Sequence, residues 1–415
     1  MGQNDGVNEA PNEKSPPVGT ALLMGYDLDT YRKLETMDIQ PVLEALLTEC
    51  PVRKVEDGGL MFLRMDDIRQ IQRNPGTRSG RAAEHDESVL GNARPLIPLQ
   101  IDGQLHTQYR KILDPLFTPK KVAPLEPAVR ALTRELVDGF IDDGEADLYG
   151  QFCAILPATV FVRLMGIPES DIPYFIEFKN DLLRRDLTEA PEDTSARLVA
   201  AGKRCYEYFN RVVEEREAKG EPGDDLIGWF MTAEVDGHRL TREDILDITY
   251  LLMIAGLDTV AASLSCFFSW LARHPERRQQ AVANPSMWPR VVEELLRFET
   301  PVPNTGRFAA ADMEINGRHI PAGTALHMSW ATANLDPEIF PNPLTVDFDR
   351  PTVPHVTFAS GFHRCLGSHL ARLELRTVLD EFHRLIPEYR IRPGSELHYE
   401  ALPVRLVNPL PLAWP

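Results

Sequence analysis

The chain has 415 residues, of which 43% are hydrophobic and 26% charged, a composition typical of a globular protein long enough to enclose a ligand. Its formal net charge of −18 argues against nucleic-acid binding, which needs a basic face. The five cysteines form no C-x-x-C pair, so the sequence indicates neither a zinc site nor a disulfide framework and favours a reducing, cytoplasmic compartment.

The first third of the chain begins with a polar stretch and then becomes helical. Residues 1–20 lack the charged and apolar regions of a secretory signal, so we expect a disordered tail followed by a single domain at 21–415. The segment QPVLEALLTE predicts a short helix, and VRKVEDGGLMFLR predicts a hairpin around two glycines. Amphipathic patterns then predict helices at 125–144, 171–186 and 194–219.

A long apolar helix is predicted in the middle of the chain. Thr241 and Asp244 form a capping-box pattern at its start, and Pro275 stops it after His274. Because Asp258 stands in its centre, we expect a buried core helix rather than a membrane span.

The remainder of the chain adds a smaller β component. EELLRF predicts a further helix, MEINGRHIPAGTALHMSW a strand–turn–strand pair, and the last forty residues loops and small strands. The predicted fold class is therefore mainly α with a minor β region.

Three residues that disfavour a regular apolar helix gather within that long helix. Gly256 costs about 1 kcal/mol relative to alanine, Asp258 is costly to bury without a partner, and Thr259 can bond back to a helix carbonyl. Together they predict a local distortion with acid and hydroxyl groups beside a cavity. The alternative is a simple kink with a salt bridge to the aspartate.

Two pairs of polar residues have helical spacing. Glu294 and Arg297 share a helix face, and Arg350 follows as a possible second partner of the glutamate; the alternative is a surface ion pair. His106 and Arg110 also share a face and suit an anionic group, although a solvated basic face would look the same.

The segment FASGFHRCLGSHLARLEL places one cysteine just before a strongly periodic helical pattern. Cys365 would lie at the helix N-terminus, where free N–H groups favour a thiolate. Gly361 and Gly367 would let a planar group approach the backbone, and Phe358 would shield the sulfur. From this stretch alone, a buried thiol beside two turns remains open.

These constellations, taken in order, resemble those of the cytochrome P-450 superfamily over nearly all of the chain after about residue 25. The cysteine-ligand loop of that family matches Phe358, Gly361, His363, Cys365 and Gly367. The other matches are AGLDT at Ala255–Thr259, the E-x-x-R pair Glu294 and Arg297 with Arg350, the H-x-x-x-R pair His106 and Arg110, and Arg307.

The resemblance implies a heme b cofactor and a role for each matched residue. Cys365 would be the axial iron ligand, Phe358, Gly361 and Gly367 would surround it, and Ala255 and Gly256 would border the cofactor. The other implied roles are propionate binding by His106, Arg110, Arg307 and His363, proton relay by Thr259 and Asp258, scaffolding by Glu294, Arg297 and Arg350, and a substrate pocket formed by Leu96, Leu99, Leu251, Ile254, Ala255, Val302, Pro403 and Val404.

The resemblance also implies a monooxygenase that uses O2 and two electrons. The soluble bacterial branch of the family usually takes electrons from a ferredoxin and its reductase, and a monomer is the default. Lys120, Lys121, Arg364 and Arg372 would form the docking face, unless they are scattered surface charges. The apolar pocket suits a hydrophobic small molecule, and Arg94 would contact its polar end unless it is an ordinary loop arginine.

Two other functions share these motifs. A peroxide-driven peroxygenase would tend to lack the acid–alcohol pair that Asp258 and Thr259 supply, and a non-catalytic haem sensor would not need it. The chain departs from the family at Ala359, commonly glycine, and at DGQL before His106, where relatives often have two prolines.

Overall fold

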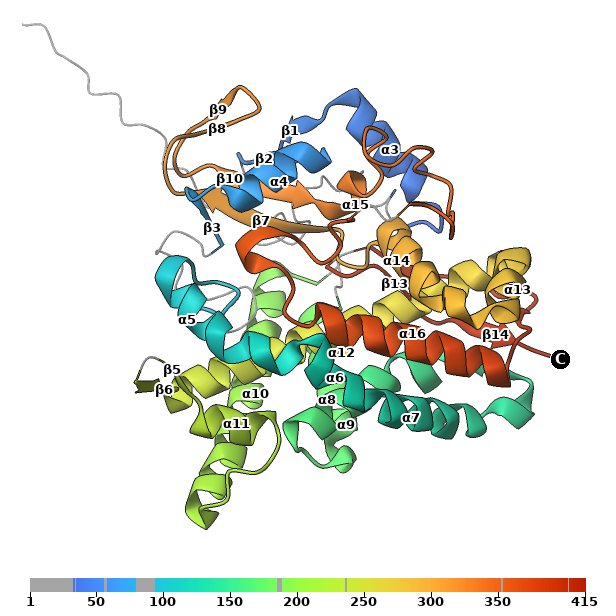
Figure 1. The fold of residues 1–415 in the computed structure, drawn as a ribbon, viewed down its shortest axis with the longest axis horizontal. Helices are drawn as coiled ribbons and strands as arrows, with labels where there is room; N and C mark the ends of the chain where they lie inside the picture. Colours follow the sequence, from blue (N-terminus) through green and yellow to red (C-terminus); the bar gives the residue numbers. More distant parts are fainter. Residues whose placement is uncertain are drawn as a thin grey trace, which may run out of the picture.

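The structure is a computed structural model that describes residues 33, 35–55, 58–79, 94–184, 189–235, 237–351, 354–401 and 403–415. The tail predicted at 1–20 lies outside the described residues. Figure 1 shows a small region rich in strands above a larger region of helices.

The strand-rich region is built on a mixed five-stranded sheet. Its order is β1 (Val52–Lys54), β2 (Leu60–Phe62), β10 (Ala325–Ser329), β7 (Asn304–Ala309) and β3 (Thr77–Arg78). The hairpin predicted from VRKVEDGGLMFLR is confirmed, since β1 pairs antiparallel with β2. Helices α3 (Gln40–Glu49), α4 (Met65–Arg73) and α15 (Trp330–Ala333) accompany this sheet.

The helical region contains the predicted helices with modest shifts of their ends. The segment predicted as one helix over 125–144 is α7 (Glu126–Asp138), which ends because Gly139 begins a turn that leads to Gly144 with a φ of 71°. The other helices described here are α5 (Gly103–Leu113), α6 (Pro119–Val122), α8 (Ile155–Met165), α9 (Ile172–Leu183), α10 (Pro191–Lys219), α11 (Leu226–Thr232), α12 (Arg242–Arg273), α13 (Pro275–Ala283), α14 (Trp288–Glu299) and α16 (Ser368–Leu385).

Short strand pairs complete the fold around these helices. β8 (Met313–Ile315) pairs with β9 (Arg318–Ile320), and β12 (Tyr399–Glu400) pairs with β13 (Leu406–Val407). β14 (Pro411–Ala413) lies between β11 (Arg390–Ile391) and β4 (Glu145–Asp147), and β5 (Glu234–Val235) pairs with β6 (His238–Arg239). The prediction of small strands near the end of the chain is confirmed.

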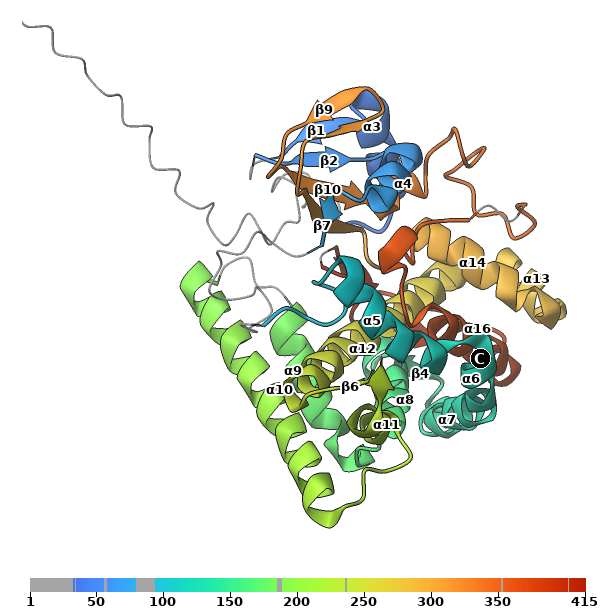
Figure 2. The ribbon, with the colours of Figure 1, turned by 60° about the vertical axis from the view of Figure 1, so that its left-hand side comes forward.

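Helix α12 crosses the core, as predicted. Thr241 Oγ1 accepts from the Asp244 N–H and the Asp244 carboxylate accepts from the Thr241 N–H, which is the predicted capping box. In the described part of the chain this is the helix long and apolar enough to cross a membrane, but 67% of its most apolar window is buried inside the protein. Figure 2 shows it running between α8 and α16.

The predicted distortion in the middle of α12 was wrong. The helix is unbroken from Arg242 to Arg273, and the Thr259 hydroxyl donates to the Ala255 carbonyl at 2.8 Å. Gly256 faces α8, where an added Cβ would meet the Phe161 ring at an ordinary 3.5 Å. A regular helix therefore accommodates all three residues, because the Thr259 and Asp258 side chains find partners without breaking the helical hydrogen bonds.

Candidate active site

Cys365 lies on the loop that leads into α16. Its N–H donates to the Phe358 carbonyl at 2.9 Å, which closes a loop that contains a short 3₁₀ turn at Gly361–His363. The thiol is accessible yet surrounded by protein, and this burial raises its pKa, while the Gly367 N–H and the Arg110 guanidinium act to lower it. The helix N-terminus alone does not make a thiolate; a bound metal would.

The two glycines of this loop serve different purposes. Gly361 has a φ of 68°, and a Cβ there would stand 2.7 Å from the Gln72 carbonyl of α4, so its need for glycine comes from a backbone contact that the sequence did not reveal. Open space stands where a Gly367 Cβ would be, which fits close approach of a flat group. Ala359, at the position where the resemblance implied glycine, has a φ of 54°.

Two arginines and two histidines gather near this loop from three segments. The rings of His106 on α5 and His363 lie 4.2 Å apart, and His363 Nε2 is 2.9 Å from Asp102 Oδ1. Arg110, one turn after His106, donates from Nη1 to the Arg364 carbonyl at 2.8 Å. Arg307 on β7 donates to the Gly306 carbonyl.

The burial of this cluster and its unsatisfied nitrogen fit an anionic ligand. Burial and the neighbouring cations lower the pKa of His106 to about 4, and burial likewise lowers the pKa values of His363 and Arg307. His106 Nε2 is buried and lacks a hydrogen-bond partner within the described ranges. Carboxylates of a bound group would satisfy this atom and stabilise the cations, as the propionates of a haem do.

Asp258 is held in a buried network between α12 and the C-terminal end of α9. Its side chain is 0% exposed and its carboxylate lies 2.7 Å from Arg184 Nη2 and 3.1 Å from Lys179 Nζ. Burial acts to raise its pKa, but these two cations outweigh burial and hold the pKa below its usual range. Tyr149 links the two cations, accepting from Arg184 at 2.6 Å and from Lys179 at 3.1 Å.

The predicted substrate residues do not all line one space. Ala255 is exposed although it lies midway along a core helix, and Leu251, Ile254, Val302 and Pro403 are half-buried. Leu99 is 41% exposed. Leu96 and Val404, in contrast, are packed into hydrophobic clusters at 0% and 6% exposure and are core residues in this structure.

The predicted scaffold is confirmed as a contact set. Glu294 accepts two hydrogen bonds from Arg297, at 2.9 and 2.8 Å, and a third from Arg350 at 3.0 Å. Arg297 also donates to carbonyls of three residues between 334 and 345, so α14 is fastened to the loop that precedes the cysteine segment. The surface-pair alternative is wrong, because both side chains of the E-x-x-R pair are buried.

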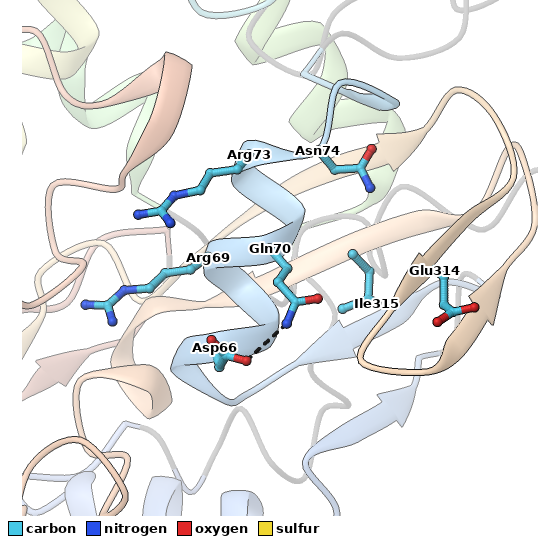
Figure 3. A pocket seen from close by; sticks show the side chains of 7 residues that line it. All are labelled: Asp66, Arg69, Gln70, Arg73, Asn74, Glu314 and Ile315. Atoms are coloured by element: carbon cyan, nitrogen blue, oxygen red, sulfur yellow. Dashed lines mark hydrogen bonds between the residues drawn. The ribbon is translucent and has the colours of Figure 1, made fainter.

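Two hollows flank α4 on the outer surface. A cavity of about 430 Å³ lies between α4 and β8, and Figure 3 shows Arg69 and Arg73 extending from α4 on the side away from Glu314. A cleft of about 1000 Å³ lies on the outer face of the cysteine loop. Its lining includes Arg69, Arg73, Arg290, Glu293, Phe358, Ala359, Gly361, Arg364 and Arg372.

Arg94, predicted to contact the substrate or to be an ordinary loop arginine, is paired with a protein carboxylate. Its Nε donates to Asp247 at 2.8 Å, and the buried Asp247 carboxylate also accepts from Tyr206 at 2.6 Å. Arg94 thus joins its loop to α12 and α10. The guanidinium is engaged by protein carboxylates, which weakens the case for a substrate carboxylate there.

Comparison with known proteins places the chain in a family. The family model described as Cytochrome P450 matches residues 175–284 and 278–396. The Cytochrome P450 monooxygenase PikC of Streptomyces venezuelae is 30% identical over 96% of this chain and 95% of its own. The Vitamin D(3) 25-hydroxylase of Pseudonocardia autotrophica is 31% identical over 90% of this chain and 93% of its own.

Solved structures agree with these matches. A mutant of P450 EryK in complex with erythromycin B superposes with a TM-score of 0.81 at 27% identity, covering 92% of this chain and 98% of that chain. The chain therefore belongs to the cytochrome P450 family and is a bacterial-type monooxygenase, an oxidoreductase. Membership implies a haem bound through a cysteine thiolate.

Sequence reasoning missed the residues that support the motif residues. Lys179 and Arg184, the partners of Asp258, lie in or just after α9, and Glu293 and His355 lie behind the cysteine loop. A signal existed for Lys179, since a lysine on the apolar face of a predicted helix needs a buried anion. The pairing itself depends on two helices about 80 residues apart in the chain.

Proposed function

We propose that residues 21–415 form one catalytic domain that hydroxylates a hydrophobic small molecule, with Cys365 as the axial ligand of heme b. The observation that carries this assignment is the accessible Cys365 thiol before α16, beside a cluster of two arginines and two histidines in which His106 Nε2 is buried and unsatisfied. A planar metal cofactor with two carboxylates supplies what both features need.

Each residue of the site would have a physical task in this reaction. His106, Arg110, Arg307 and His363 would bind and orient the propionates through charge-assisted hydrogen bonds. Phe358 would keep water from the sulfur, and the Gly367 N–H would donate toward it. When bound, the haem supplies the oxygen activation that the side chains of the protein cannot.

Protons would reach the side of the haem where oxygen binds by passing along α12. The Thr259 hydroxyl, which donates to the Ala255 carbonyl, stands beside the exposed face of the helix and can pass a proton without breaking the helix. Asp258, ionised at rest, would turn away from Arg184, whose side chain is 19% exposed, take a proton from water there and then pass it to this site. Asp258 and Thr259 would thus form a path for protons between bulk water and the haem site.

The substrate would be an extended hydrophobic molecule. The accessible face beside Leu251, Ile254 and Ala255 is apolar. A relative named Vitamin D(3) 25-hydroxylase and a neighbour solved with erythromycin B support a molecule larger than a simple aromatic. Leu96 and Val404 would not contact it unless their loops move, because both are buried in the core.

A ferredoxin with its reductase would supply the electrons to a cytoplasmic monomer. Lys120 and Lys121 on α6 and Arg364 on the cysteine loop are exposed, and Arg69 and Arg73 line the cleft beside that loop. These cations suit an acidic partner on an otherwise acidic protein. Arg372 contributes less than expected, because its guanidinium is paired with Glu293 at 2.6 and 2.9 Å.

Replacement of the cysteine tests the assignment directly. We expect Cys365→Ser to abolish the absorption band that a thiolate-ligated haem gives when reduced under carbon monoxide. Cys50→Ser is the matched control, since Cys50 is also exposed but lies on the far strand-rich region, and it should leave the band unchanged. A band that survives Cys365→Ser would remove Cys365 from the iron, and loss of the band in both variants would point to a general defect.

A further inference from the structure

Arg372 lies in the first two turns of α16, seven residues after Cys365, and its surroundings differ from those of a surface arginine. Its Cζ atom stands 4.3 Å from the centre of the Phe358 ring, a cation–π contact. Phe358 in turn accepts the Cys365 N–H through its carbonyl. The guanidinium thus contacts the cysteine loop through the Phe358 ring.

Two residues hold the guanidinium over that ring. Glu293 on α14 accepts from Arg372 Nε at 2.6 Å and from Nη2 at 2.9 Å, the fork-to-fork geometry that fixes the plane of an arginine. His355 Nε2 lies 3.1 Å from Glu293 Oε2, the oxygen that also accepts from Arg372 Nη2, and the His355 side chain is only 5% exposed. The Ser368 carbonyl accepts weakly from Nη1 at 3.5 Å.

The carboxylate of this group stays ionised. Burial acts to raise the pKa of Glu293, but the His355 and Arg372 hydrogen bonds lower it to about 2. The group is therefore a fixed charge assembly from three segments: α14, the loop before Phe358, and α16. An exposed ion pair needs two side chains and contributes at most about 1 kcal/mol. This assembly has more members than such a pair needs.

We infer that Glu293 and His355 clamp Arg372 over Phe358 as a positioning device that sets the electrostatic environment of the proximal sulfur. The cation withdraws electron density through the ring face and fixes the ring, so that Phe358 keeps one distance from the sulfur. Arg372 is a positioning residue, because it acts through Phe358 and touches neither cofactor nor substrate. This inference rests on the proposed binding of haem at Cys365.

The reduction potential of the holoprotein tests this assignment. Arg372→Gln should shift the ferric–ferrous equilibrium toward ferric iron by about threefold to tenfold, because a cation near the sulfur is lost. The iron–sulfur stretching frequency should also move in resonance Raman spectra. Arg372→Lys keeps the charge but cannot form the fork or stack on the ring, so its potential should fall between those of wild type and Arg372→Gln.

Arg376, one turn further along α16, is the matched control. It is also an ion-paired arginine, 3.3 Å from Glu126, but within the described ranges it is Arg372 and not Arg376 that stacks on Phe358. Arg376→Gln should leave both the potential and the stretching frequency unchanged. An equal shift in Arg376→Gln would replace the clamp with a general surface-charge effect and overturn the inference.

Three further outcomes separate the possible failures. Wild-type potential and frequency in a haem-loaded Arg372→Gln variant would overturn the clamp while leaving the proposed function intact. Failure of the wild-type chain to bind haem through Cys365 would instead overturn the proposed function. If Arg372→Gln does not load haem, Arg372→Lys decides alone, and wild-type values in that variant count against the clamp.

Discussion

Glu374 on α16 is a buried acid that the proposed reaction does not use. Its side chain is 3% exposed, and its Oε2 atom has no hydrogen-bond partner among the residues that the structure describes. Burial raises the pKa of this carboxyl to about 8, so it is neutral in the folded protein at pH 7. The unfolded chain, with an ordinary glutamate pKa near about 4.3, ionises it freely.

This difference predicts a pH dependence of stability. The contribution of Glu374 is fully present below about pH 4 and is lost as the pH rises to about 8, because the unfolded state gains the ionised form first. We expect the free energy of unfolding to fall by a few kcal/mol, roughly, between pH 5 and pH 8 from this group, and Glu374→Gln to remove that slope. Denaturant titrations at both pH values measure it.

Glu381, two turns further along the same helix, is the control. Its carboxyl is also buried, but it is paired with Arg130 and Arg134, and although burial acts to raise its pKa, these hydrogen bonds lower it. A lowered pKa gives stability that is present above the unfolded value and lost only in acid. Glu381→Gln should therefore leave the slope between pH 5 and pH 8 in place, and a lost slope in both variants would contradict the assignment to Glu374.

At the scale of elements, the cysteine loop contains a stored conformational cost. Ala359 has a φ of 54°, in the left-handed region, which costs an L-residue other than glycine about 1–2 kcal/mol. Its N–H still donates to the Val356 carbonyl at 2.8 Å, so the loop keeps its shape against this cost. The departure from the family at this position is therefore a departure in backbone energy.

Glycine at this position should stabilise the protein. Ala359→Gly relieves the left-handed strain, and the greater freedom of glycine in the unfolded chain offsets part of the gain, leaving about 0.5–1 kcal/mol. Thermal unfolding followed by circular dichroism measures the change. Ala371→Gly, the same substitution within α16, should instead cost about 1 kcal/mol. A destabilised Ala359→Gly variant would show that the alanine methyl packs productively.

At the scale of the whole molecule, a net charge of −18 coexists with a cationic face around α6 and the cysteine loop. Figure 2 shows α6 and α10 on opposite sides of the protein, and exposed lysines occur on both. A partner attracted by a local cluster of cations should distinguish these two faces. A partner that responds only to the net charge of the protein should not.

Charge reversal on each face tests this distinction. Lys120→Glu with Lys121→Glu should slow reduction by an acidic ferredoxin about tenfold or more at low salt, and added salt should narrow the gap to wild type. Lys203→Glu with Lys219→Glu on α10 changes the net charge equally and should have little effect. Stopped-flow reduction of the holoprotein measures both, and equal slowing by the two pairs would contradict docking on the α6 face.

The sequence by itself determined the family and most of the element order. The capping box at Thr241, the helix after Cys365 and the hairpin before α4 are local features, since turn residues and periodicity over a few residues decide them. The motif residues were also found, because their types and spacing are properties of the chain alone.

The tertiary structure decided what each of these residues contacts. The buried Asp258 carboxylate is paired with Lys179 and Arg184 from near α9. Gly361 has to be glycine because the Gln72 carbonyl of α4 lies where a Cβ would stand. The Arg372 guanidinium lies against the Phe358 ring. Leu96 and Val404 turned inward to the core although their positions suggested a pocket. Burial and charge pairing depend on segments that meet only after folding, and for that reason the linear pattern could name the site but could not predict its supporting contacts.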